Sequence, residues 1–185
     1  MTSLLARETV TDVRQHTLGK DVAIFSPDRT YRYSLTRVWG EGLRACWIML
    51  NPSTADAFTD DPTIRRCISF TKALGGYGGL VVVNLYSLRA TDPRELWMHS
   101  DPIGEAGGHY LYSQVHAAYD SHAEIIAAWG THGARHDRGA NVAQGMTNIG
   151  IELNCLGTTK DGHPKHPLYV PGDTPIVPFP QVMAP

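Results

Sequence analysis

Three short, continuous apolar runs constrain the fold of this chain most, because each ends abruptly in a polar or glycine-containing turn. Residues 45–50 run into Asn51-Pro52-Ser53, residues 80–83 into Asn84, and residues 125–129 into Gly130. Runs that are apolar at every position are typical of strands buried on both faces of a parallel sheet. The pattern therefore predicts a parallel sheet at the centre of the fold.

Helical patterns separate these predicted strands. Asp61-Pro62 is expected to open the first helix, since proline is favoured at the first helical position, and Ile64, Cys67 and Ile68 follow at helical spacing. Further helices are expected over residues 106–122 and near residues 139–149, with a fourth strand over residues 151–156. This βαβαβαβ order predicts an α/β fold with three layers, α/β/α, around a central, mainly parallel four-stranded sheet.

The two ends of the chain differ from this centre. Residues 21–25 and 31–39 have the β-branched and aromatic composition of strands, and predict an N-terminal antiparallel addition. Residues 1–20 are polar and irregular, and predict an arm or a short helix, whereas residues 171–185 follow a composition change and predict an extended tail. The length of 185 residues predicts a single α/β domain over residues 21–170.

Composition and charge exclude several classes of protein. A formal net charge of −2 excludes a coat protein that binds nucleic acid through charge alone, but it allows a local basic cleft. No run approaches about 18 apolar residues and no secretory signal opens the chain, so no membrane partner is expected. The three widely spaced cysteines are expected to be reduced and buried, which favours a cytoplasmic location. Neither C-x-x-C nor H-E-x-x-H occurs, so no metal or cofactor is expected.

The candidate site consists of the polar residues that follow each predicted strand, because ligands of open α/β sheets bind at the carboxyl ends of the strands. We expect Asn51, Asn84 and at least one of His163 and His166 to line a single cavity. Purely structural explanations of these residues remain open. Asn51-Pro52 can be an ordinary turn, Asn84 a hydrogen-bonded asparagine at a strand end, and residues 163–167 a surface loop stiffened by two prolines. The full set is Asn51, Ser53, Thr54, Asp56, Asn84, Ser87, Thr131, His132, Arg135, His136, Lys160, Asp161, His163, Lys165 and His166.

Four segments occur in an order that is also found in a known superfamily. They are Trp-Ile-Met-Leu-Asn-Pro at 47–52, Leu-Val-Val-Val-Asn at 80–84, Ile-Ala-Ala-Trp-Gly at 126–130, and His163-Pro164 or His166-Pro167. Together they resemble the uracil-DNA glycosylase superfamily. The chain is closer still to the uncharacterised DUF1643 family, whose Leu-Asn-Pro-Ser-Thr-Ala-Asp, Asp-Pro-Thr and His-Pro-Leu-Tyr patterns it contains.

The resemblance implies a glycosylase-like fold and a DNA base- or nucleotide-processing activity, most simply a DNA glycosylase acting on a modified or damaged base. Asn51 would position the water, Asn84 would hydrogen-bond the base edge, and a histidine, His166 or His163, would stabilise the departing base. Asp56 is the alternative catalytic carboxylate, although Ser53 and Asp56 also resemble a capping box. The other implied residues are Pro52, Ser53, Thr54 and Ser87 for the substrate, and Arg135, His132, Lys160, Lys165, Leu168 and Tyr169 for DNA.

A binding module without catalysis is the second hypothesis. An amide stands at position 51, where a carboxylate would activate water better, and this favours a protein that keeps the pocket but only binds a nucleotide, a modified base or a protein partner. A different transfer reaction on a nucleobase is a third possibility, since a fold does not fix a reaction. The sequence leaves the substrate base, the strand state and the oligomeric state open.

Overall fold

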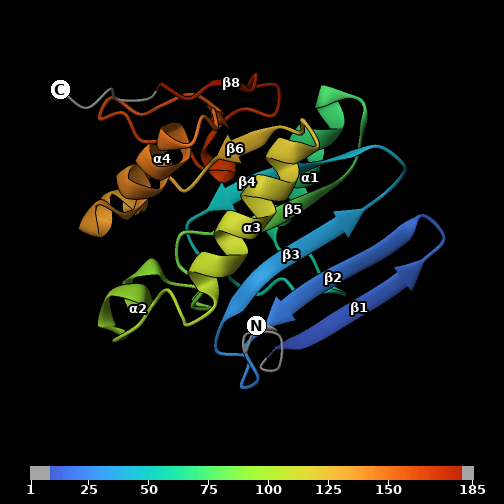
Figure 1. Cartoon of the computed structure of the whole chain (residues 1–185), viewed down its shortest axis with the longest axis horizontal. Helices are drawn as coiled ribbons and strands as arrows, with labels where there is room; N and C mark the ends of the chain where they lie inside the picture. Colours follow the sequence, from blue (N-terminus) through green and yellow to red (C-terminus); the bar gives the residue numbers. More distant parts are fainter. Residues whose placement is uncertain (1–8, 181–185) are drawn as a thin grey trace.

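The computed structural model describes residues 9–180, which form one eight-stranded mixed sheet with helices packed against it (Figure 1). The strand order is β1-β2-β3-β5-β4-β6-β7-β8. The strands are β1 (Val10–His16), β2 (Gly19–Phe25), β3 (Arg32–Val38), β4 (Leu43–Met49), β5 (Tyr77–Asn84), β6 (Ile125–Ala127), β7 (Asn154–Cys155) and β8 (Val177–Pro178).

Strand direction corrects the predicted sheet. The neighbours β1, β2, β3 and β5 pair antiparallel, β5, β4, β6 and β7 pair parallel, and β8 pairs antiparallel with β7. Four of these seven pairings are antiparallel, so the prediction of a central, mainly parallel four-stranded sheet is wrong, and the fold is a mixed α/β fold. A buried apolar run does not determine the direction of its neighbour. β3 pairs antiparallel with β5, with Leu35 opposite Val82, and the strands β2 and β1 continue the sheet beyond β3.

The helices begin close to where the sequence places them, with α2 as an additional short helix. Asp61 caps α1 by accepting a hydrogen bond from the backbone N–H of Ile64 at 2.8 Å. Pro62 follows in the first turn, where its missing N–H leaves no hydrogen bond unmade. The helices are α1 (Pro62–Leu74), α2 (Pro93–Met98), α3 (Gly107–Asp120) and α4 (Arg138–Asn148), and the 3-10 segments are η2 (Thr131–Asp137) and η3 (Pro167–Tyr169).

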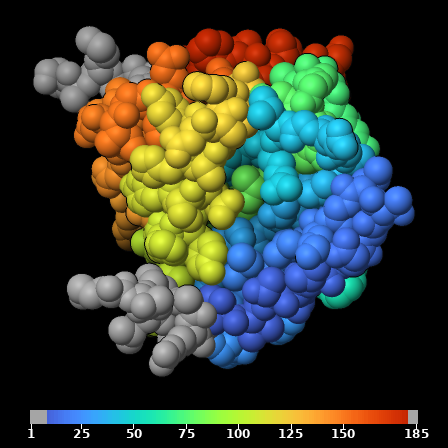
Figure 2. Space-filling view, turned by 45° about the vertical axis from the view of Figure 1, so that its right-hand side comes forward, coloured from blue at the N-terminus to red at the C-terminus, as the bar shows by residue number. Residues whose placement is uncertain are grey.

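The sheet separates two apolar cores, because neighbouring residues of β4 point to opposite faces. Trp47 packs with Ile64 and Phe70 of α1 on one face. Ile48 packs with Leu111 and other apolar residues of α3 on the opposite face. Figure 2 shows α3, in yellow, lying over this second face beside the blue N-terminal strands. The two cores hold α1 and α3 on opposite sides of the inner strands.

Both ends of the described chain contribute strands. Residues 10–16, within the predicted arm, form β1 and pair with β2. Val177–Pro178, within the predicted tail, pair with β7. The outermost residues of the predicted arm and tail, 1–8 and 181–185, lie outside the described residues. Between residues 9 and 180, every helix is too short or too polar to cross a membrane.

Candidate functional site

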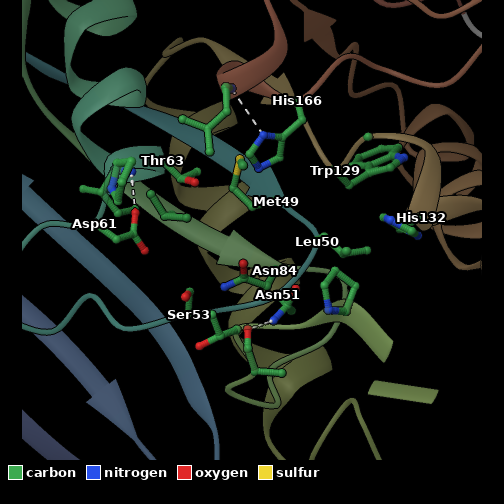
Figure 3. Close-up of a pocket in the computed structure, with 18 of the residues that line it drawn as sticks. Met49, Leu50, Asn51, Ser53, Asp61, Thr63, Asn84, Trp129, His132 and His166 are labelled. Atoms are coloured by element: carbon green, nitrogen blue, oxygen red, sulfur yellow. Dashed lines mark hydrogen bonds between the residues drawn. The ribbon is translucent and has the colours of Figure 1, made fainter. Parts of the chain in front are cut away.

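A cavity of about 620 Å³ opens at the carboxyl ends of β4 and β5, on the side of the sheet that carries α1. Its walls come from the loop after β4, the start of α1, the end of β5, the β6–η2 junction and turn η3 (Figure 3). Most of its lining is apolar and includes Met49, Ile64 and Trp129, and polar side chains are set among these residues. A cavity of this size and character suits a small planar ligand with polar edges.

Asn84, the last residue of β5, presents an unpaired amide to the cavity. It is only 3% exposed, and neither Nδ2 nor Oδ1 has a hydrogen-bond partner within residues 9–180. An unpaired buried polar group costs about 1–3 kcal/mol. Because an amide both donates and accepts, a ligand with adjacent acceptor and donor groups would satisfy both atoms.

Asn51 follows β4 and lines the same cavity, but its amide hydrogens are already bound. Its Nδ2 donates to the carbonyl oxygens of Pro52 at 2.9 Å and of Ala90 at 2.8 Å. These bonds tie the loop after β4 to the segment after β5. Only Oδ1 of Asn51 therefore remains to accept a hydrogen bond from a water or a ligand.

His166, immediately before η3, is held as a neutral imidazole. Its Nδ1 accepts a hydrogen bond from the backbone N–H of Leu168 at 3.3 Å, so the neutral ring carries its proton on Nε2. Burial lowers the pKa of His166 to about 4, and the nearby Asp61 carboxylate opposes this shift only in part. At neutral pH, His166 is an uncharged Nε2–H donor at the cavity (Figure 3).

Two charged residues of the cavity wall, Arg32 and Asp61, are absent from the predicted site. Arg32 is 2% exposed; its Nη1 donates to the carbonyl oxygen of Ala55 at 2.6 Å, and its Nε has no partner in the described chain. Burial lowers the pKa of Arg32 to about 10, so the guanidinium stays charged at neutral pH. The Asp-Pro-Thr pattern at 61–63 was the available signal for Asp61, whereas nothing distinguishes Arg32 from other strand residues.

The cavity brings together most of the residues that the sequence singles out. Asn51, Asn84 and one histidine were expected to share a cavity; the structure places them there, and the histidine is His166. The predicted residues that line the cavity are Asn51, Ser53, Thr54, Asn84, Thr131, His132, Lys165, His166, Leu168 and Tyr169.

Other predicted residues lie away from this cavity. The Oδ1 of Asp56 accepts hydrogen bonds from the backbone N–H groups of Phe58 and Thr59 in its own turn, and since no helix begins at Ser53, the predicted capping box is not formed. His163 lines a second cavity, of about 450 Å³, whose wall includes Trp129. The guanidinium of Arg135 lies over the ring of Trp97, 4.9 Å from its centroid. The remaining residues are Pro52 and Ser87, which are buried, His136 and Lys160, which are exposed, and Asp161, which lines the second cavity.

The cavity offers hydrogen-bond donors and acceptors on several of its walls. Among residues 9–180, no group of three or more His, Cys, Asp or Glu side chains is arranged to hold a metal ion. The cavity instead combines a free amide on Asn84, a neutral donor on His166 and a carboxylate on Asp61. Such a set can bind a planar ligand by its edge, and His166 can stabilise negative charge that develops there.

Comparison with known proteins yields one family. The chain matches the DUF1643 family, described as a protein of unknown function, over residues 32–168. This range holds every residue that lines the cavity except Tyr169. No curated protein and no solved structure matches the chain.

Proposed function

The matched residues make up most of the chain, so it belongs to the DUF1643 family, and we propose that it binds a nucleobase of DNA or of a nucleotide and hydrolyses the N-glycosidic bond. The observation that carries this proposal is the buried, unpaired amide of Asn84 on the cavity wall. The edge of a nucleobase offers adjacent donors and acceptors, which match both atoms of that amide. The order of the four sequence segments, which resembles that of the uracil-DNA glycosylase superfamily, agrees with the same assignment.

In the proposed reaction, a water oxygen attacks C1′ of the sugar while the C1′–N bond breaks and its electron pair leaves with the base. The water's proton passes to the departing base or to solvent. Asn84 holds the base edge, and the Nε2–H of His166 donates to the base atom on which negative charge develops. Oδ1 of Asn51 accepts a hydrogen bond from the attacking water.

Turn η3 supports a nucleic-acid substrate. Tyr169 is 84% exposed at the rim of the cavity, next to Leu168. Arg66 fixes the turn, because its guanidinium donates to the carbonyl oxygens of Pro167 at 3.2 Å and Val170 at 2.6 Å. A fixed, exposed apolar tip beside a base pocket is suited to fill the gap that a flipped base leaves in a strand.

Incubation with a panel of bases tests this proposal. The panel contains normal, deaminated and hypermodified bases, presented in single-stranded DNA, in duplex DNA and as nucleotides, and the assay scores abasic sites, released base and retention of DNA. We expect release of at least one base by the wild type. His166→Ala should lower kcat by about 10²–10³ with retention nearly intact, because it removes a hydrogen bond to developing charge. His163→Ala, a histidine outside the cavity, is the matched control and should keep full turnover.

Base binding without catalysis is the second candidate, and the hydrogen bonding of Asn51 favours it. Both amide hydrogens of Asn51 are engaged, and its amide oxygen is a weak activator of water. If the protein binds bases without catalysis, the wild type retains DNA or a nucleotide and leaves every base intact. That result would overturn the hydrolase assignment and keep the base-binding one, whereas failure to retain any member of the panel would overturn both.

A further inference from the structure

The two carboxylate oxygens of Asp61 have different surroundings. One accepts the hydrogen bond from the N–H of Ile64 at 2.8 Å, which fixes the orientation of the carboxylate at the start of α1. The other has no hydrogen-bond partner among the described residues. Asp61 is only 9% exposed and lines the same cavity as Asn84 and His166 (Figure 3). This second oxygen is open to solvent in the cavity, because the fully buried side-chain atoms without a partner in residues 9–180 belong to Arg32, Asn84 and Arg89.

Capping of α1 does not account for a charged residue at position 61. Asparagine and serine cap a helix as well as aspartate does. Arg32 lies close enough to interact electrostatically with Asp61, but no ion pair joins the two within residues 9–180. A ligand that fills the cavity would exclude water from the free oxygen, and a carboxylate oxygen left without a hydrogen bond in this way is costly. The free oxygen of Asp61 thus points to a ligand that brings a hydrogen-bond donor.

The neighbouring groups indicate what kind of donor this is. Asn84 can both donate and accept, and the neutral ring of His166 donates through Nε2. The free carboxylate oxygen of Asp61 accepts hydrogen bonds, so it complements an N–H₂ group and disfavours a carbonyl oxygen at the same position. An exocyclic amino group is the sole difference between guanine and hypoxanthine, whereas cytosine differs from uracil in its amino group and in the lack of a hydrogen on N3.

We propose, building on the proposed function, that Asp61 selects nucleobases that carry an exocyclic amino group over analogues that lack it. The amino group donates to the free oxygen of Asp61, while Asn84 and His166 hold the rest of the base edge. A site built around a hydrogen bond rejects the analogue that cannot make it, because its buried partner is then left unpaired. The proposed ligand is therefore an amino-substituted base, and its deaminated counterpart binds poorly.

Matched pairs of nucleosides test the selection directly. Cytidine is compared with uridine and guanosine with inosine, each as the free nucleoside and at the centre of a single-stranded oligonucleotide. Dissociation constants are measured by calorimetry or by ligand-observed NMR. In at least one pair, the wild type should bind the amino member at least about tenfold more tightly than its partner, the effect expected for one unpaired buried polar group.

The Asp61→Asn variant tests whether Asp61 is the residue that selects the amino group. The asparagine oxygen still caps α1, so the fold should survive, while its N–H₂ group replaces the free oxygen at the cavity. The preference should then reverse, because the new donor matches a carbonyl oxygen and opposes an amino group. Asp92→Asn is the matched control: Asp92 caps α2 by accepting from the N–H of Arg94 and does not line the cavity, so the preference should stay unchanged.

The outcomes separate this inference from the proposed function. Equal binding of both members of every pair would overturn the selection by Asp61 and leave base binding standing. An amino preference that persists in Asp61→Asn would overturn it too, because another residue must then read the amino group. Failure of the wild type to bind any nucleoside or oligonucleotide would overturn the proposed function and this inference with it.

Discussion

Replacement by leucine at Asn51 and at Asn84 should change the stability of the fold in opposite directions. Asn84 is the last residue of β5 and Asn51 follows the end of β4; both line the cavity, but their hydrogen bonding differs. Asn84→Leu removes an amide that is buried and unpaired, and the larger side chain extends into empty space. Asn51→Leu removes two hydrogen bonds to backbone carbonyl oxygens. The first change should stabilise the fold and the second should destabilise it.

The magnitudes follow from these contacts. An unpaired buried polar group costs about 1–3 kcal/mol, so Asn84→Leu should raise the free energy of unfolding by about 1–2 kcal/mol. Each hydrogen bond of Asn51 contributes about 0.5–1.5 kcal/mol, so Asn51→Leu should lower that free energy by about 1–3 kcal/mol. For a chain of this length, each kcal/mol moves Tm by about 2–4 °C. The two variants should therefore melt on opposite sides of the wild type.

Urea unfolding and thermal unfolding, followed by circular dichroism, measure both changes. Ligand binding should be lost in Asn84→Leu although its fold is more stable, as expected when a functional group is retained at a cost in stability. A fall of more than about 1 kcal/mol in the unfolding free energy of Asn84→Leu would refute the reasoning, since the amide must then be satisfied in the free protein.

Three further predictions concern the wall formed by His166 and η3. The pKa of His166 is lowered from 6.5 to about 4 in the folded chain, so the unfolded chain binds one more proton than the folded chain between pH 6.5 and pH 4. The unfolding free energy should therefore fall as the pH is lowered through this range. The fall should be smaller in His166→Gln, which cannot bind that proton. Arg66→Ala should speed amide hydrogen exchange in residues 166–170 and weaken ligand binding, because two hydrogen bonds to carbonyl oxygens are lost. Tyr169→Ala should change the unfolding free energy by less than about 0.5 kcal/mol in urea unfolding, yet weaken retention of DNA more than that of a nucleotide.

The apolar runs were sufficient to locate the inner strands but not to set the architecture of the sheet. Residues 80–83 lie within β5, as their composition predicts. The same composition says nothing about the strand on the other side of β5, which is the antiparallel β3. Residues 10–16 have no continuous apolar pattern because β1 lies at the edge of the sheet, where most of its side chains remain exposed or half-buried. An edge strand of this kind gives a weak sequence signal.

Some features of the candidate site depend on the local sequence, whereas others depend on contacts between residues far apart in the chain. The position of Asn51 and Asn84 at strand ends is local, and the sequence predicts it. Their different hydrogen bonding is not local, because one partner of Asn51 is the carbonyl oxygen of Ala90, 39 residues along the chain. Asp61 has a complete local explanation as a helix cap, and the Asp-Pro-Thr pattern at 61–63 is the one sequence feature that points beyond it. Only the packing of α1 brings its free oxygen to the cavity wall.

Helix α1 supports groups on two sides of the cavity. Its N-terminal cap is Asp61, and Arg66 in its second turn binds the backbone around η3, about 100 residues away, next to His166. The helix is itself anchored through Ile64 and Phe70 in the apolar core beneath it. The relative position of Asp61 and His166 is therefore set by core packing rather than by loop conformation, and sites built on rigid elements hold their geometry best. Two groups fixed in this way can distinguish ligands that differ by a single amino group.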